Sequence, residues 1–430
     1  MSADNRVPVI LVAGLDGSAV GRVTDGLLAP GTVAVRHDLG AVAQGVVVRT
    51  VRVGGPVTAG ADVQVEWIDL DHGCVSCTLE HDLLPFLRRL ARREGVDRIV
   101  LELDPAIEPE PLCFAVNHHV VADMVGYPDA PAGADVRIQA VIACVDVGSW
   151  LAHAGGDETL VEAGLIAEDA DERTLAQVVV GQVDFADAIV ASGTAPSRTW
   201  DDARTFAALG RLNPVAPMLL ELPERPLTRP LVEAFLEAVP ADARRGRVFD
   251  AHEPLLRGQP PLTSDCGVQL VEFVARRPFH PERLHEAIDV LLEGVISARG
   301  RLWVASQPDE ALWLESAGGG LRVAAGGRWL AAMSDVERQS QDAGRRVLAE
   351  ANWDPVHGDR HTYLLVLAHQ ADPEIIRATL AGALLTDVEY ALGQRQWLRY
   401  SDPFGQFHEE PCSDTDSADR QLFDQSINGE

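Results

Sequence analysis

Short apolar runs alternate with amphipathic segments along the first half of the chain. Apolar runs of four to eight residues predict strands, and apolar residues three or four positions apart predict helices. Strands are expected over residues 7–13, 46–53, 63–68, 98–103, 136–146, 187–191 and 218–222, and helices over 78–93, 110–125, 172–183 and 200–209. This alternation predicts a largely parallel sheet covered on both faces, so we expect an α/β domain over residues 1–222.

The pattern changes after residue 222. Residues 223–265 contain a proline-rich stretch, one helix and a linker, and a smaller α+β domain is expected over 266–408. Within it we expect strands over 268–275, 301–305, 312–315, 321–324 and 363–368, and helices over 281–293 and, last, 372–380. Residues 409–430 are acidic and polar, so we expect a disordered tail.

The charge balance is strongly acidic, with a net charge of −29 over 430 residues. All 36 basic residues are arginine. The absence of lysine excludes pyridoxal-phosphate Schiff-base chemistry, lysine general bases and a phosphate-loop lysine. An acidic surface is repelled by nucleic-acid phosphates and by anionic membranes. We therefore expect basic protein partners, no direct nucleic-acid binding and no membrane association.

Cysteine content and the N-terminal sequence indicate the compartment. Six cysteines are too few for a disulfide scaffold of this length. The apolar runs are shorter than a membrane span, and the first residues lack the basic and apolar regions of a signal peptide. We expect a cytoplasmic protein.

A degraded phosphate loop follows the first expected strand. A working loop needs glycines, a lysine for the phosphate charge and a Ser or Thr for magnesium. Gly14 and Gly17 keep part of the glycine frame, but the lysine position is Val20 and the hydroxyl position is Gly21. Gly14, Gly17, Ser18 and Arg22 are the candidate remnants of a phosphate site. The alternative is a tight strand-to-helix turn that binds nothing.

The sharpest chemical signal is a Cys-x-x-Cys pair, Cys74 and Cys77, before an amphipathic helix. A helix N-terminus favours thiolates, and in a reducing compartment such a pair is more often a metal or redox site than a structural bridge. His72 adds a nitrogen donor two residues earlier. Two thiolates and an imidazole suit zinc. A redox dithiol, or two cysteines that only fill space, are the alternatives.

Two charged clusters have simpler interpretations. Glu102, Asp104, Glu108 and Glu110 follow one strand, and we expect a solvated acidic loop there. Arginines at positions 88, 89, 92 and 93 lie on one helix, and we expect them to pair with nearby acidic side chains.

Several further segments occur in a characteristic order. They are VILVAGLDGS, RHDLG (36–40), GCVSCTLEHDLLPFLRRL, IVLELDPAIEPEPL (99–112), CVDVGSWL, FADAIVASGTA, RRPFHPERL, ISARGRLWVA and WDPVHGDRH. As an ordered set they resemble the CobW-type GTPases and metallochaperones over nearly the whole chain. The resemblance implies a P-loop GTPase-like α/β domain followed by a CobW C-terminal domain. It also places Asp38 in the family's acidic metal-ligand position.

The departures from the family pattern concern the nucleotide. The phosphate-loop Lys and Thr are missing, the Glu-x-x-Gly motif ends in Pro105, and Ser192–Ala195 replaces the guanine-reading Asn-Lys-x-Asp. Proline has no N–H to offer a γ-phosphate. The middle motif cysteine is Ser76. We therefore expect a pseudo-GTPase with negligible GTP turnover and no catalytic residue, and residual nucleotide binding stays open. Zinc is the expected cofactor, with donors at Cys74, Cys77, His72 and Asp38.

A protein that keeps metal donors and loses nucleotide contacts is expected to act as a sensor or adaptor. The actinobacterial, Mrf-like branch of the family, found with zinc-free ribosomal protein paralogues, resembles this lysine-free chain. That resemblance implies a zinc-responsive, non-catalytic adaptor that recruits a ribosome hibernation factor to the small ribosomal subunit during zinc starvation. Its partners would be the hibernation factor and small-subunit ribosomal proteins. A zinc metallochaperone GTPase and a redox-active dithiol protein remain as alternatives.

Overall fold

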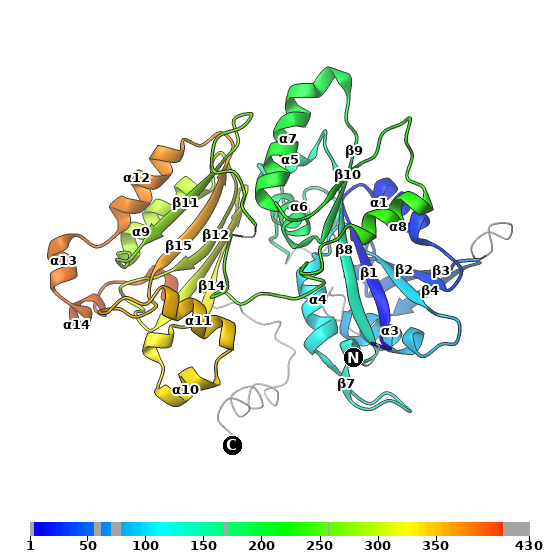
Figure 1. Ribbon diagram of the computed structural model, residues 1–430, viewed down its shortest axis with the longest axis horizontal. Coiled ribbons are helices and arrows are strands. Elements are labelled where there is room, and N and C mark those ends of the chain that lie inside the picture. The colour runs from blue at the N-terminus through cyan, green and yellow to red at the C-terminus, as the bar shows by residue number, and fades with distance from the viewer. Residues whose placement is uncertain (1–3, 56–61, 70–78, 167–170, 257, 407–430) are drawn as a thin grey trace.

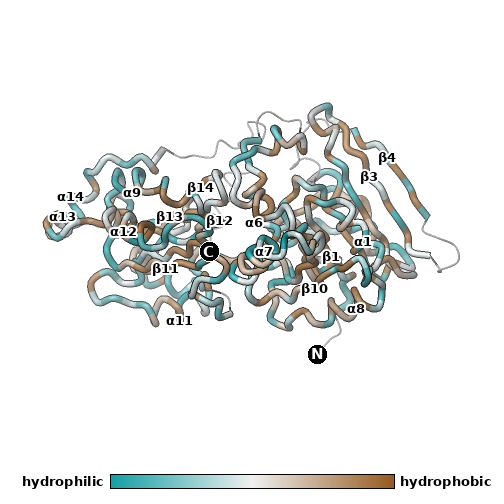
Figure 2. The backbone as a smooth tube through the Cα atoms, turned by 90° about the horizontal axis from the view of Figure 1, so that it is seen from above, coloured by the Kyte–Doolittle hydropathy of each residue, from teal (hydrophilic) through white to brown (hydrophobic). Residues whose placement is uncertain are grey.

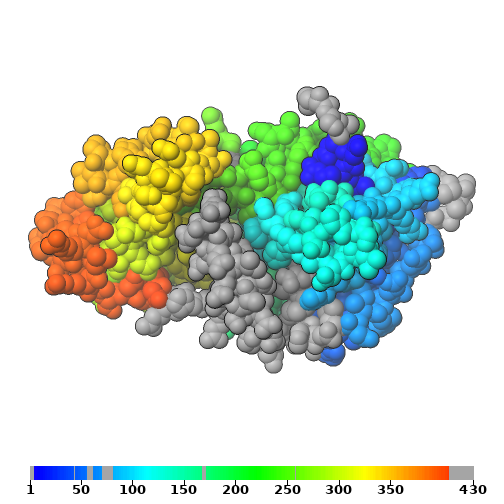
Figure 3. All heavy atoms as spheres, turned by 90° about the horizontal axis from the view of Figure 1, so that it is seen from below, coloured from blue at the N-terminus to red at the C-terminus, as the bar shows by residue number. Residues whose placement is uncertain are grey.

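A computed structural model of the chain describes residues 4–55, 62–69, 79–166, 171–256 and 258–406. The described chain forms two units, each built on one large sheet (Figure 1). Seen from below, the N-terminal unit in blue to cyan and the C-terminal unit in yellow to orange lie side by side (Figure 3). The expected α/β architecture followed by an α+β domain is confirmed.

The N-terminal sheet has eight strands in the order β10-β9-β8-β1-β5-β2-β3-β4. Their bounds are β1 (Val7–Ala13), β2 (Thr32–Asp38), β3 (Val46–Val53), β4 (Asp62–Asp69), β5 (Arg98–Glu102), β8 (Val136–Asp146), β9 (Ala188–Ser192) and β10 (Met218–Leu220). The pairs from β10 to β2 are parallel, whereas β3 and β4 add antiparallel strands. All seven expected strands are present, and β2 is the one that pattern alone did not list.

Helices cover both faces of this sheet. On one face α1 (Gly17–Leu27) and α8 (Arg229–Glu237) pack on β1 and β5. On the other face lie α3 (Leu84–Ala91) and α4 (Pro109–His118), followed along the sheet by α5 (Trp150–Ala154), α6 (Leu175–Phe185) and α7 (Thr199–Leu212). This arrangement leaves the carboxyl ends of β1, β5, β8 and β9 at one edge of the sheet, where α/β proteins bind ligands.

One expected helix is shorter than its sequence pattern suggested. The helix over 110–125 ends at His118, and the prediction beyond it is wrong. The chain instead forms β6 (Val120–Val121), which pairs with β7 (Ala130–Pro131). Val125 is 98% exposed, so its apolar spacing does not mark a buried face.

The C-terminal unit is a five-stranded antiparallel sheet in the order β11-β15-β12-β13-β14. The strands are β11 (Gln269–Ala275), β12 (Val295–Leu302), β13 (Glu310–Ala317), β14 (Gly320–Arg328) and β15 (Thr362–Ala368). One face packs on α9 (Pro281–Ala287) and α12 (Pro373–Ala383), and the other joins the N-terminal unit in a shared apolar core that includes Leu270, Leu365 and Leu367.

Two expectations for this unit need correction. The strand expected over 301–305 lies earlier, in β12. The prediction missed its start because Ser297 and Arg301 look like surface positions in the sequence, whereas the structure buries both. The helix over 372–380 is not the last. The structure adds α10 (Asp335–Ser340), α11 (Ala343–Ala351), α13 (Asp387–Ala391) and α14 (Gln394–Trp397). None of the helices in the described parts of the chain is long and apolar enough to cross a membrane.

Candidate functional site

The turn between β1 and α1 carries the candidate phosphate-loop residues. Gly14 lies so close to β8 that a Cβ atom there would be 2.5 Å from the carbonyl oxygen of Cys144. Helix α1 begins at Gly17, three positions before the lysine slot at Val20. Val20 is 2% exposed and packs in the core under the helix. Part of what would be an open phosphate loop is therefore helical, and its lysine position points inward.

Asp16 caps the N-terminus of α1 with its own side chain. The backbone N–H of Ser18 donates to Asp16 Oδ1 at 2.9 Å, and the Ser18 hydroxyl donates to the same oxygen at 2.7 Å. Burial opposes ionisation of this carboxyl, but the hydrogen bonds from Ser18 outweigh it and lower the pKa of Asp16. A helix N-terminus attracts anions, and here the chain supplies the anion itself.

Arg22, the cation nearest this turn, is engaged by another carboxylate. Its Nε and Nη2 donate to the two oxygens of Glu221 at 2.8 and 2.9 Å, and its Nη1 donates to Ser18 Oγ at 3.0 Å. The hydrogen bond to Glu221 raises the pKa of Arg22. Gly14, Gly17, Ser18 and Arg22 are thus brought together, but the side chains of Ser18 and Arg22 already have partners within the protein.

The region after β9, where the family reads guanine, holds an arginine. Arg198 Nη2 donates to the carbonyl oxygen of Gly193 at 2.5 Å. A Cβ atom at Gly148 would lie 2.4 Å from the same nitrogen, so the guanidinium rests against Gly148. Gly193 has φ +76°, and a side chain there would meet Asp146. The guanidinium therefore packs against the backbone at both Gly148 and Gly193.

A cavity of about 300 Å³ lies at the ends of β1 and β8. Its polar lining consists of Asp16, Asp146, Ser149, His153 and Gln182. Among the described residues two carboxylates and no arginine line it, so the charge of this lining is unfavourable for a phosphate group.

The acidic residues after β5 are structural, and the expectation of a solvated loop there is wrong. Glu102 is 7% exposed and binds Arg36 at 3.0 Å and Arg52 at 2.8 Å. Asp104 accepts from the N–H groups of Leu39 and Ala106, and burial raises its pKa.

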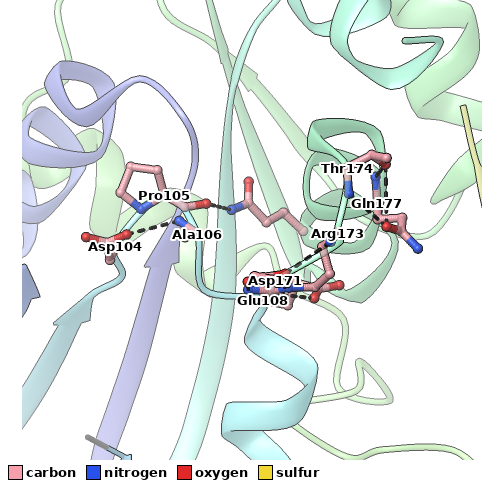
Figure 4. Close-up of polar contacts among 9 residues, drawn as sticks. Asp104, Pro105, Ala106, Glu108, Asp171, Arg173, Thr174 and Gln177 are labelled. Atoms are coloured by element: carbon pink, nitrogen blue, oxygen red, sulfur yellow. Dashed lines mark hydrogen bonds and ion pairs between the residues drawn. The ribbon is translucent and has the colours of Figure 1, made fainter. Parts of the chain in front are cut away.

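Figure 4 shows how this loop continues into α4 and toward α6. Glu108 binds Arg173 at 2.8 Å, and Arg173 also binds Asp171. Pro105 offers only its carbonyl oxygen, which accepts from Gln182 at 3.4 Å. The segment that in GTPases approaches the γ-phosphate is here tied down by internal hydrogen bonds and ion pairs.

Among the candidate zinc donors, Asp38 is described, whereas His72, Cys74 and Cys77 lie outside the described residues. Asp38 ends β2, and its side chain is 52% exposed. Its Oδ1 accepts from Gly40 N at 3.0 Å, and its Oδ2 lies 3.7 Å from Arg36 Nη2. Within the parts of the chain that the structure describes, no three His, Cys, Asp or Glu side chains are grouped to hold a metal ion.

Sequence reasoning missed a buried polar cluster beside Asp38. The His37 Nε2 lies 2.7 Å from Asp82 Oδ2, and Arg49 Nη1 donates to Asp82 Oδ1 at 2.5 Å. Burial opposes the ionisation of Asp82, but the contacts with His37 and Arg49 lower its pKa. Asp82 lies in the helical turn Leu79–Leu83, so the cluster anchors the helix that follows the Cys-x-x-Cys motif to β2 and β3. These residues are far apart in sequence and carry no local signal.

Comparison with known families accounts for both units. The family model described as the CobW/HypB/UreG nucleotide-binding domain matches residues 48–219, and the cobalamin synthesis protein cobW C-terminal domain matches residues 268–384. A protein of Mycobacterium tuberculosis named Zinc chaperone Rv0106 is 46% identical over 415 residues, covering 96% of each chain. This chain belongs to the CobW family.

Other CobW relatives are more distant. A Dictyostelium discoideum protein named Zinc-regulated GTPase metalloprotein activator 1 is 27% identical over 354 residues, which cover 80% of this chain and 72% of that protein. The crystal structure of Zn(II)-bound YjiA GTPase from E. coli aligns with a TM-score of 0.37 and 15% identity over 88% of this chain and 99% of that one. The two family models and the 46% identical relative confirm the predicted family.

Proposed function

We propose that this CobW-family protein is a zinc-responsive adaptor that works without GTP hydrolysis. The proposal separates two properties that the family's GTPases combine. Zinc handling is retained through Cys74, Cys77, His72 and Asp38, and nucleotide turnover is lost. The binding state of the metal then controls a protein partner directly.

The observation that carries the proposal is the Asp16 carboxylate on the N-terminus of α1. A bound phosphate would need the Ser18 N–H that Asp16 already accepts from. Two anions at one helix end repel each other, and the chain has no lysine to offset that repulsion. Arg22 is held by Glu221, so its charge is also balanced. GTP binding would therefore require several internal contacts to break together.

The described donor fits a zinc role. Asp38 is half exposed. Within the described parts of the chain its Oδ2 oxygen accepts no hydrogen bond, and Arg36 Nη2 lies 3.7 Å away. Zinc accepts carboxylate oxygen together with thiolate and imidazole, so Asp38 could complete a set with Cys74, Cys77 and His72. Bound zinc would supply a charged cross-link between these segments. The His37–Asp82–Arg49 cluster keeps β2 and the helix after the motif in fixed positions.

For the partner we propose a ribosome hibernation factor, recruited to the small ribosomal subunit when zinc is scarce. The support is chemical. The acidic chain attracts basic proteins and repels bare ribosomal RNA. A second candidate function, zinc delivery to an apo-enzyme, is favoured by the names of the relatives, one of which is a zinc chaperone sharing 46% of its residues.

Two measurements on the purified chain test the metal and the nucleotide. We expect about one zinc ion per chain, lost in Cys74→Ser/Cys77→Ser and kept in the control Cys266→Ser, whose cysteine lies outside the motif. We expect GTP hydrolysis no faster than in buffer. Stoichiometric zinc in the double variant contradicts the metal assignment, and GTP turnover contradicts the non-catalytic adaptor.

The partner is tested by affinity purification from native cells at low and replete zinc. A hibernation factor and small-subunit proteins that co-purify in a zinc-dependent way, and are lost in the double cysteine variant, would support the adaptor. A single apo-metalloenzyme would instead support zinc delivery.

A further inference from the structure

Strand β4 forms the outer edge of the eight-stranded sheet. It pairs antiparallel with β3, from Val46 opposite Asp69 to Val53 opposite Asp62, without a register shift. Among the described residues no strand pairs with its other edge. Figure 2 shows β4 outermost, with β3 between it and the rest of the unit. Every other residue of this eight-residue strand therefore presents its backbone N–H and C=O outward, away from β3.

Apolar side chains line one face of this edge strand. Val63 and Val65 are each 54% exposed, and Trp67 is 72% exposed. Alternate residues of a strand share a face, so these three side chains stand in one row. Their β3 partners are Arg52, Thr50 and Val48, all half-buried. Of these three partners only Val48, opposite Trp67, is apolar, so the apolar row lies mainly on β4 itself.

β4 carries only part of the usual protection of an exposed edge, in the form of three carboxylates. Proteins commonly protect such edges with charged side chains, especially lysine, with proline, a bulge or a very short strand. Asp62–Asp69 contains neither lysine nor proline, runs for eight residues and has no bulge. An edge of this kind readily accepts another strand.

The charge of the surface selects the added strand. The two arginines of β3 are each bound by two carboxylates, Arg49 by Asp82 and Glu66, and Arg52 by Asp25 and Glu102. Asp62 and Asp69 form no ion pair with the described residues. A second copy of β4 in full antiparallel register would place Asp62 opposite Asp69, and like charges directly opposite destabilise a strand pair. The charge therefore disfavours self-association and favours a basic segment.

We propose that β4 binds an extended segment of a basic protein, which adds to the sheet as a further strand. Backbone hydrogen bonds along β4 give the affinity. Apolar side chains of the segment cover Val63, Val65 and Trp67, and its arginines or lysines, on the opposite face, lie beside Asp62 and Glu66. The strand β4 contains none of the residues proposed for the metal or the nucleotide site. The proposal therefore goes beyond the adaptor function and does not depend on it.

Fluorescence anisotropy with synthetic peptides tests the proposal on the full chain. The probe is an eight-residue labelled peptide that alternates valine and arginine, and its counterpart alternates valine and glutamate. We expect the basic peptide to bind at least about tenfold more tightly, and to weaken between about 50 and about 300 mM salt. A third peptide, methylated on alternate backbone nitrogens, should lose at least about tenfold because it cannot donate to the edge.

Matched variants locate the binding surface. Val65→Lys/Trp67→Lys should weaken binding of the basic peptide at least about tenfold, while Val388→Lys, on the 75% exposed side chain of Val388 in α13, should leave it unchanged. Both variants should unfold at the wild-type temperature, because the altered side chains are exposed.

Four results would overturn the proposal. They are no binding of the basic peptide, equal binding of basic and acidic peptides, full affinity of the methylated peptide, and wild-type affinity in the β4 variant. A wild-type dimer by light scattering that dissociates in the β4 variant would also overturn it, because the occupant would then be a second copy.

Discussion

Arg22 forms a two-point ion pair with Glu221, 199 positions later in the chain, at 2.8 and 2.9 Å. The pair joins α1, the helix that follows β1, to the residue that follows β10. It also takes the only arginine of the degraded phosphate turn away from any external anion. In this protein, therefore, a contact that stabilises the fold replaces one that would bind a nucleotide.

Breaking that pair should cost little stability and restore no activity. Glu221→Gln removes the carboxylate charge, and because Arg22 is 43% exposed we expect the free energy of unfolding to fall by only about 0.5–1 kcal/mol. GTP hydrolysis should stay at the buffer rate, since Asp16 still occupies the helix end. Urea unfolding and a phosphate-release assay check both. Measurable GTP turnover in this variant would show that the ion pair between Arg22 and Glu221 is the only feature that prevents GTP hydrolysis.

Restoring the missing lysine should damage the fold instead of rebuilding the loop. The side chain of Val20 is 2% exposed, so Val20→Lys would bury an ammonium group without a partner. We expect a loss of about 3 kcal/mol or more of unfolding free energy, and no gain in GTP affinity. Val20→Met, which brings a side chain close to lysine in length but without charge, is the control and should lose about 1 kcal/mol. Calorimetry and nucleotide binding would measure both, and tight GTP binding by the lysine variant would contradict the structure.

The arginines of α3 should differ sharply in importance. Arg88 is fully buried, binds Asp135 at 2.8 Å and donates to the carbonyl oxygens of Val121 and Ala130. Arg88→Ala leaves these groups unpaired, so we expect a loss of about 3–5 kcal/mol. Arg92 also contacts Asp135 but is 42% exposed, and Arg92→Ala should cost less than about 1 kcal/mol. Equal losses in chemical denaturation would refute the difference.

Stability should fall as the pH rises from about 5 to 8, through Glu110. Burial between the two units raises the pKa of this carboxyl from 4.5 to about 7, with Asp184 and Glu315 adding to the effect and Arg244 and Arg299 opposing it. The folded protein then holds a proton that the unfolded chain has lost, so unfolding becomes easier as the pH passes from 4.5 to 7.

Glu110→Gln removes that dependence. It should match the wild type near pH 5 and be more stable near pH 8, by up to about 3 kcal/mol. The measurement is the free energy of unfolding of both proteins in urea at each pH. A difference that is the same at pH 5 and pH 8 would show that Glu110 does not titrate in this range.

The sequence alone determined the elements that depend on local pattern. Buried strands such as Val136–Asp146 appear as continuous apolar runs, and the family order of the motifs gave the architecture. The missing lysine and the degraded guanine-reading segment pointed to lost GTP turnover, because side-chain chemistry is visible without coordinates. Of the four arginines expected to pair with acidic residues, Arg88 and Arg92 do so, but their partner, Asp135, lies more than forty positions away and is not local in the sequence.

Tertiary structure decided what distant residues do to one another. It shows that Glu102 and Asp104 are buried and partnered where a solvated loop was expected, since their partners come from β2 and β3 and the turn after β2. It also places Asp16 on the helix end and Glu221 on Arg22. Asp16 before a helix is a capping signal in the sequence. Only the structure shows that its carboxylate accepts the Ser18 N–H that a phosphate at this helix end would need. Burial and pairing depend on how strands assemble, and that assembly joins residues that no local pattern connects.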